Sequence, residues 1–441
     1  MAHSNEIDSL WPKAPIDTLI DPFKRFLHIE SAGGIALLIA TVVALVLANS
    51  SVADWYLALW KTKVGFTLGS FQMIHSLQHW INDGLMAVFF FVVGLEVKRE
   101  IVMGELQDIR QAALPLAAAV GGMAVPAGIY LLLQYDSPGV LGWGIPMATD
   151  IAFVVGILAV LGSRISNSLR VMLLSLAIAD DIGAILVIAV GYSAGLNYGA
   201  LAFAIAGILV MLVFMKVGVR NVGIYIFLMI MVWFGFHESG IHATIAGVIC
   251  GLMTPARSWL NEGVLSDIVN RTRIFVQGGG WQNTDAKNAA LRMMEVASRK
   301  SISPLERFET GLHPWVGFVI MPVFALANAG VPINAADFTD PVATAVAASL
   351  IIGKPAGIIL FSWLIIKTGI ARMPAGISWG AIAGGGTLAG VGFTMAIFIA
   401  SLALECPQLD AAKVGVLAGS ALCASAGAVI LIITLPKPTH E

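Results

Sequence analysis

Charged residues are scarce in this chain. Asp, Glu, Lys and Arg make up 12% of its 441 residues and 58% are hydrophobic, whereas a soluble domain carries about 25% charged residues. This balance excludes an ordinary soluble domain and indicates a polytopic membrane protein. The net charge of −2 gives no reason to expect a nucleic-acid partner.

Cysteine is also rare. Cys250, Cys406 and Cys423 are far apart and lie in or beside apolar stretches, so neither a disulfide framework nor a metal cluster follows from them. We interpret them as buried, inert thiols. Residues 1–27 are polar and lack an apolar core followed by a small-residue cleavage site, so we expect a cytoplasmic N-terminal segment and no cleaved signal peptide.

The chain has many long apolar runs. A transmembrane helix needs about 20 mostly apolar residues, and twelve runs meet or approach this length. They are residues 28–49, 80–101, 112–134, 142–161, 168–192, 198–217, 222–236, 240–256, 313–331, 342–367, 377–404 and 412–435. We therefore predict an all-α membrane protein with about twelve transmembrane helices, forming a polytopic transporter domain at residues 28–435.

Lys and Arg are concentrated in every second connection between these runs. Because cytoplasmic loops carry the excess of these residues, we place both termini in the cytoplasm, including a short tail at residues 436–441. Residues 63–74 alternate apolar with small or polar residues around Gly69 and predict a hairpin on the outer face; an irregular loop is the alternative. Residues 257–312 form a long cytoplasmic insertion of unknown role, and residues 285–300 have the pattern of a helix.

Two of the apolar runs are interrupted by glycine and proline. Residues 142–161 contain Pro146 among several glycines, and residues 377–404 contain Gly390 and Gly392 after a triple glycine. Broken backbone is tolerated at membrane depth only where protein buries it or a cavity adjoins it. The runs around each interruption form two similar triplets that begin on opposite sides, which predicts inverted-topology repeats with two discontinuous helices crossing at the midplane. Alternatively, these glycines only let helices pack closely.

Two adjacent carboxylates, Asp180 and Asp181, lie in the middle of the run at 168–192. One carboxylate at the centre of a membrane helix costs roughly 2.5–3.5 kcal/mol, and two repel each other in a weak dielectric. The pair must be neutralised by protons or by a cation, so one site accepts either, competitively. Na⁺ and Li⁺ prefer oxygen ligands, which the carboxylates, the Thr149 hydroxyl and unwound carbonyls can supply. A salt bridge that only tethers two helices is the structural alternative.

Two further intramembrane charges accompany the pair. Half-helix ends that meet at a break carry about half a unit charge each. Asp150 suits the positive N-terminal ends, and Lys354 suits the negative C-terminal ends. Lys354 can instead pair with Asp180 and release it when the pair gains protons, and the sequence does not decide between these roles.

Charged residues also crowd the cytoplasmic end of the second run, where Glu96, Arg99 and Glu100 lie close together. Ordinary interfacial charges are the default interpretation, and a cytoplasmic entrance whose electrostatics respond to pH is the functional one. His242 and His313 titrate in the relevant range, although a lone histidine is more often structural.

Nine segments, in order and over nearly the whole chain, resemble the NhaA-type sodium/proton antiporters of bacterial inner membranes. They are Trp80–Gly84, Phe91–Glu100, Ala148–Phe153, Ala177–Ala184, Ser239–Thr244, Leu312–Trp315, Phe324–Gly330, Ile352–Pro355 and Gly392–Ile399. This family is itself an established case of inverted repeats, so the two inferences are not independent.

The resemblance implies a Na⁺, Li⁺ and H⁺ site at Asp180 and Asp181 with Thr149 and Asp150 nearby, and Lys354 as the basic partner in the core. It implies a pH-responsive cluster onto which Glu96, Arg99, Glu100 and Glu309 map. It also implies electrogenic exchange that needs no cofactor, no enzymatic activity, and a homodimer joined partly through the hairpin. Thr310 stands where the family can carry a histidine, and the insertion is longer than expected, which puts the pH threshold in doubt.

Other functions remain open from the residues alone. A sodium-coupled carrier of an organic solute would need polar or aromatic groups around a larger cavity, and no such cluster is evident. An intramembrane aspartyl protease could use Asp150 and Asp181, but Lys354 nearby would oppose the shared-proton chemistry. A channel fits less well, because several charges at one depth suit a saturable site.

Overall fold

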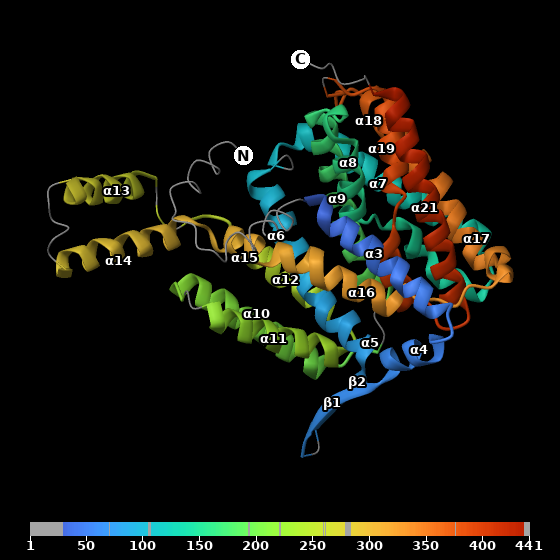
Figure 1. Cartoon of the computed structure of the whole chain (residues 1–441), viewed down its shortest axis with the longest axis horizontal. Coiled ribbons are helices and arrows are strands. Elements are labelled where there is room, and N and C mark those ends of the chain that lie inside the picture. Colours follow the sequence, from blue (N-terminus) through green and yellow to red (C-terminus); the bar gives the residue numbers. More distant parts are fainter. Residues whose placement is uncertain are drawn as a thin grey trace.

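The computed structural model describes residues 30–69, 71–104, 107–192, 195–219, 222–258, 260, 262–277, 284–374 and 376–435. These residues are almost entirely helical (Figure 1). Within the described part of the chain, seven helices are long and apolar enough to cross a membrane, or up to ten spans if each of three bent pairs counts as one. The chain is therefore an all-α multi-pass membrane protein. The predicted terminal segments at 1–27 and 436–441 lie outside the described residues.

The elements follow one another in the order of the predicted runs. In chain order they are α3 (Glu30–Ala48), α4 (Ala53–Lys61), β1 (Lys63–Leu68), β2 (Phe71–Ser76), α5 (Leu77–Trp80), η1 (Ile81–Leu85), α6 (Met86–Met103), α7 (Ile109–Leu133), η3 (Pro138–Met147), α8 (Ile151–Leu161), η4 (Gly162–Arg164), α9 (Asn167–Gly191), α10 (Tyr198–Val217), α11 (Val222–Ser239), α12 (Thr244–Met253), α13 (Glu262–Gln277), α14 (Thr284–Ser301), α15 (Pro304–Trp315), η6 (Val316–Ile320), α16 (Met321–Asn328), η7 (Ala335–Thr339), α17 (Pro341–Ala348), η8 (Ser349–Gly353), α18 (Lys354–Lys367), α19 (Trp379–Ala389), α20 (Phe393–Ala403) and α21 (Gln408–Thr434).

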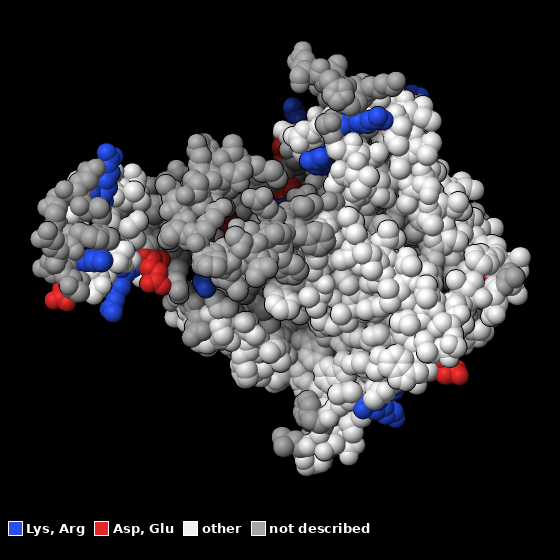
Figure 2. Space-filling view, viewed as in Figure 1, with Lys and Arg blue, Asp and Glu red and all other residues white. Residues whose placement is uncertain are grey.

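Strands β1 and β2 pair antiparallel with Lys63 opposite Ser76, so this segment is a hairpin rather than an irregular loop. Its turn residue Ser70 lies outside the described residues. The hairpin projects from the end of the bundle opposite the C-terminal end of α21 (Figure 1). Figure 2 shows a broad uncharged surface across the middle of one face, with charges near its margins and on α13 and α14. A belt of this kind suits a hydrocarbon layer.

Two boundaries differ from the prediction. The span expected at 313–331 begins at Pro304 and continues through η6 and α16 to Asn328. Ser303 caps this helix, because its Oγ accepts the Glu306 N–H at 3.1 Å, and proline is favoured at the first helical position. The insertion also contains α13 in addition to the helix expected near its end, and the two form a pair that projects from the body (Figure 1).

Both predicted interruptions are present. Helices η3 and α8 bend by 41° and α19 and α20 bend by 45°, each at a break of a few residues. The breaks touch, because the Asp150 N–H donates to the Val391 carbonyl at 2.7 Å. Gly392 permits this approach, since a Cβ on it would lie 2.9 Å from the Ala148 carbonyl oxygen. The contact between the two breaks positions the polar centre of the molecule.

Candidate ion-binding site

The site is built around α9, which carries Asp180 and Asp181 at mid-length. Ser166 starts this helix by accepting the Leu169 N–H at 3.3 Å. The two aspartates are buried, with 1% and 2% of their surface exposed. Because adjacent residues on a helix point about 100° apart, the two carboxylates meet different surroundings.

Asp180 lies against a lysine. Its Oδ2 accepts from Lys354 Nζ at 2.6 Å and from Thr149 Oγ1 at 2.5 Å. The Lys354 side chain is fully buried, and its Nζ also donates to the Met147 carbonyl at the end of η3. Lys354 therefore pairs with Asp180 and also lies at the negative end of a half-helix.

Thr149 connects the acid pair to the second broken helix. Besides its contact with Asp180, Thr149 Oγ1 lies 2.9 Å from the Ala389 carbonyl at the end of α19. A hydroxyl has one proton, so it donates to only one of these acceptors at a time. Whether the Thr149 hydroxyl donates to Asp180 or to the Ala389 carbonyl is therefore linked to the protonation of Asp180.

Asp150 joins the N-terminal ends of both broken helices. It caps α8, with Oδ1 accepting the Phe153 N–H at 3.2 Å. Its Oδ2 accepts from Thr394 N at 3.1 Å and Thr394 Oγ1 at 2.5 Å, at the start of α20. A carboxylate at two positive helix ends is the arrangement predicted for Asp150.

Thr394 is a site residue that the sequence analysis missed. It lies in the resemblance segment Gly392–Ile399, directly after the break, as Thr149 lies within the other break. Together the two threonines place a hydroxyl beside each of two buried aspartates.

The acid pair has unused acceptor capacity. Among the described residues, Oδ1 of Asp180 and Oδ1 of Asp181 are buried and have no hydrogen-bond partner. The charges that act on Asp181 include the carboxylates of Asp180, Glu96 and Asp150 and the Lys354 ammonium. Buried polar atoms without partners are rare and require an explanation. Protons or a small cation would satisfy these oxygens.

The predicted pH-responsive residues fall into two groups. Arg99 Nη1 donates to Glu309 Oε1, which ties α6 to α15. Glu100 lines a cavity of about 490 Å³ with Met103, Gln107 and other residues, just beyond the same end of α6. His313 is exposed on α15, one turn from Glu309, and Glu96 interacts electrostatically with Glu309, Arg99 and Asp181.

His242 does not belong to this cluster. It lies between α11 and α12 and interacts with Asp83, which precedes α6. Arg99 is near the other end of α6. His242 is therefore separated from Arg99 by most of the length of α6, because α11 and α12 meet at the opposite end of this helix, and a pH response at His242 stays a prediction.

Buried carboxylates with unpartnered oxygens among the described residues, a buried lysine and two touching helix breaks inside a multi-pass bundle define an ion-carrier type of membrane protein. Comparison with known proteins agrees. The family described as Na⁺/H⁺ antiporter 1 matches residues 24–431. The chain belongs to this family, and this membership confirms the resemblance predicted from the motifs. The family consists of transporters rather than enzymes.

Individual relatives cover almost the whole chain. The Na⁺/H⁺ antiporter NhaA of Rhodopirellula baltica is 54% identical over 430 residues, which is 98% of each chain. The NhaA of Rhizobium meliloti is 49% identical over 440 residues, covering 98% of this chain and 99% of its own. An NhaA of Vibrio vulnificus is 44% identical over 412 residues, covering 93% and 92%.

Proposed function

We propose that this protein is a secondary antiporter that exchanges cytoplasmic Na⁺ or Li⁺ for external protons across the bacterial inner membrane. One observation carries the proposal: Asp180 and Asp181 each hold a buried oxygen without a partner among the described residues. The same oxygens bind either a hard cation or protons, so the two ligands compete. Membership of a family of Na⁺/H⁺ antiporters supports this assignment.

The two aspartates have different roles in this proposal. Asp181 is the principal cation ligand, because no described residue donates to its Oδ1. Asp180 shares the cation and is held by Lys354 and Thr149. Backbone carbonyls at the breaks and the Thr149 oxygen complete an all-oxygen shell of the kind that hard cations prefer.

Proton binding releases the cation. When external protons neutralise the carboxylates, the electrostatic attraction that holds Na⁺ disappears, and the neutral site can be presented to the other face. Two acidic groups accept protons while one cation is held, so more protons enter than sodium ions leave. Exchange is therefore electrogenic and uses the membrane potential, which is worth about 2.3 kcal/mol per charge per 100 mV.

We assign twelve membrane spans with inverted repeats to the fold, and we place both termini in the cytoplasm. In this assignment the broken helices η3–α8 and α19–α20 cross at the midplane of the membrane. The belt of uncharged surface and the opposite placement of hairpin and C-terminal helix end support this orientation. The hairpin then lies on the outer face, where it joins two copies of the chain. Glu96, Arg99, Glu100, Glu309 and His313 form a cytoplasmic entrance whose charges set the pH dependence.

The decisive experiment measures proton movement in proteoliposomes that contain the purified protein and no organic solute. Addition of Na⁺ or Li⁺ should dissipate an imposed pH gradient, K⁺ serving as the comparison ion, and Asp181→Asn should abolish the response. The matched control is Asp267→Asn on α13, outside the membrane bundle. Full activity of Asp181→Asn, or a response that requires an organic solute, would overturn the proposal and favour a solute carrier.

A further inference from the structure

Three histidines from three elements converge beside the hairpin. His75 comes from β2, His79 from α5 and His237 from the end of α11. Each histidine offers a ring nitrogen, and these three nitrogens all lie within 4.8 Å of one another. The centroids of the three rings are 4.4 to 5.6 Å apart. His237 is more than 150 residues from the other two along the chain, so only the fold brings them together.

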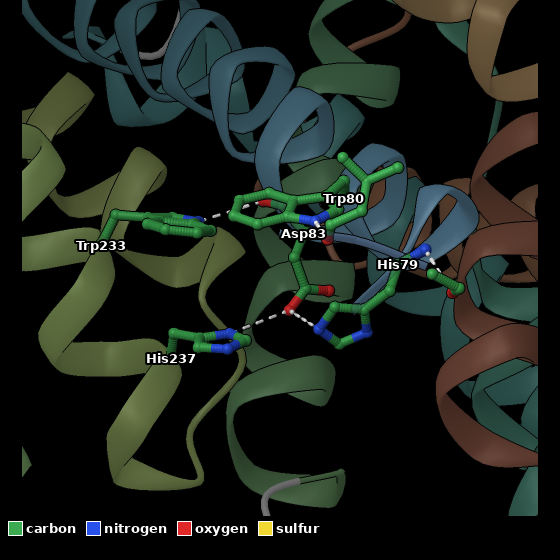
Figure 3. A network of polar contacts seen from close by, with 7 residues as sticks. His79, Trp80, Asp83, Trp233 and His237 are labelled. Atoms are coloured by element: carbon green, nitrogen blue, oxygen red, sulfur yellow. Dashed lines mark hydrogen bonds and ion pairs between the residues drawn. The ribbon is translucent and has the colours of Figure 1, made fainter. Parts of the chain in front are cut away.

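An acidic residue anchors this group. Asp83 Oδ2 lies 3.3 Å from His237 Nδ1 and 3.5 Å from His79 Nε2 (Figure 3). A carboxylate that holds one ring nitrogen fixes the orientation of an imidazole and raises its basicity as a ligand through the other nitrogen. This is the outer-shell arrangement that metal-binding histidines usually have.

The surroundings are rigid. The Trp233 indole N–H donates to the Asp83 carbonyl at 3.1 Å, and the Trp233 ring stacks on His237 at 5.5 Å and on Trp80 at 6.4 Å. Trp80 in turn donates its indole N–H to Val64 in β1 at 2.8 Å. The histidines are therefore held on a packed aromatic frame, with both indole N–H groups bonded to main-chain carbonyls (Figure 3).

The electrostatics favour a cation. Asp83 and Glu238 are the acidic groups that act on the histidines. A neutral imidazole offers the lone pair that a metal requires, and imidazole suits zinc, copper and nickel.

We propose that His75, His79 and His237 bind one divalent transition-metal ion, best represented by Zn²⁺, and that the ion clamps the hairpin to the end of α11. Three nitrogens on a tetrahedral zinc lie about 3.3 Å apart, given bond lengths of about 2.0–2.1 Å. The present separations need to contract by no more than about 1.5 Å, which side-chain rotations supply. Water takes the fourth position. The site is separate from the transported ions, whose oxygen ligands differ in chemistry.

Titration calorimetry tests the binding. The full-length protein, freed of any affinity tag and treated with a chelator, is titrated with Zn²⁺. We expect one strong Zn²⁺ per chain, loss of that site in the triple variant His75→Gln/His79→Gln/His237→Gln, and a weakening of about 10- to 100-fold in Asp83→Asn. The matched control, His313→Gln, should retain wild-type affinity. Sodium-driven exchange by the triple variant shows that it is folded.

Hydrogen exchange tests the clamp. Zn²⁺ should slow amide exchange in β2 and at the end of α11 in the wild-type protein and not in the triple variant. The proposal is overturned if the wild-type protein shows no saturable Zn²⁺ binding, or if the folded triple variant binds Zn²⁺ as tightly as the wild type. Binding without protection of either segment overturns the clamp.

Discussion

Lys354 Nζ donates to Asp180 Oδ2 at 2.6 Å, and neither side chain has any exposed surface. The lysine begins α18 and the aspartate lies in the middle of α9, so one ion pair joins two membrane helices. Removing one member of a buried pair leaves an uncompensated charge, which is far more costly than losing an exposed pair. The arrangement therefore makes stability depend on the charge state of the transport site.

Lys354→Met should lower the free energy of unfolding by about 3–5 kcal/mol, because it keeps the volume of the side chain and leaves Asp180 unpaired. Adding Asp180→Asn should recover part of this loss, since the unpaired charge is then gone. Thermal unfolding in detergent measures both effects. The control is Lys367→Met at the other end of α18, whose ammonium lies 4.4 Å from the Trp363 ring centroid. Equal losses for the two lysine variants would contradict the prediction.

Thr394→Val should destabilise the protein by about 1–3 kcal/mol, because it removes the hydroxyl that donates to the buried Asp150 carboxylate. The concentration of Na⁺ that gives half-maximal exchange should also rise, since Asp150 fixes the contact between the breaks. Thr387→Val is the matched control, because the Thr387 hydroxyl donates only within its own helix, to the Ala383 carbonyl at 2.8 Å. Unchanged Na⁺ dependence in Thr394→Val would exclude a role at the site.

The sequence predicted those parts of the site that are expensive to bury. Charges in an apolar run stand out by composition, which is why Asp150, Asp180, Asp181 and Lys354 could be named in advance. A buried threonine carries no such penalty and is common in helices, so Thr394 could not be distinguished without knowing that α20 starts beside Asp150.

Long-range contacts limited the prediction in the same way. The histidine cluster brings His75 and His79 together with His237 on α11. No short-range sequence pattern predicts this contact. The position of His242 along the chain likewise does not say which end of α6 it faces. Helix α13 is polar, as α14 is, so neither appears among the apolar runs, and only α14 was predicted, from its helical pattern.

Cys406 provides a test of orientation. It is the exposed cysteine among the three, whereas Cys250 and Cys423 are buried, and its loop between α20 and α21 should face outward if the C-terminus is cytoplasmic. Burial and the Asp410 carboxylate raise the pKa of the Cys406 thiol. A membrane-impermeant maleimide should therefore label intact cells at Cys406, faster as the pH rises, because only the thiolate reacts.

Two variants complete this test. Asp410→Asn should lower the pKa of Cys406 and speed labelling at neutral pH, since it removes the nearby negative charge. Cys406→Ser should abolish labelling. Reaction only after the membrane is permeabilised would place the loop in the cytoplasm and reverse the proposed topology.

The ion pair between Arg99 and Glu309 should control the pH dependence of exchange with little effect on stability. The Arg99 side chain is 45% exposed, so the pair contributes at most about 1 kcal/mol to folding and weakens with salt. Arg99→Gln should shift the pH at which exchange begins, because Glu309 and Glu96 then face each other without the intervening positive charge. The unfolding temperature should stay close to that of the wild type.

The charge-exchanged variant Arg99→Glu/Glu309→Arg distinguishes a specific pair from a general effect of net charge. It keeps the net charge and the contact between α6 and α15, so it should restore the pH profile more fully than either single change. Arg257→Gln serves as the control, since it removes a positive charge from the 257–312 insertion without touching this pair. If Arg99→Gln and Arg257→Gln shift the profile equally, the pH dependence comes from the overall surface charge, and the contact between α6 and α15 has no special part in it.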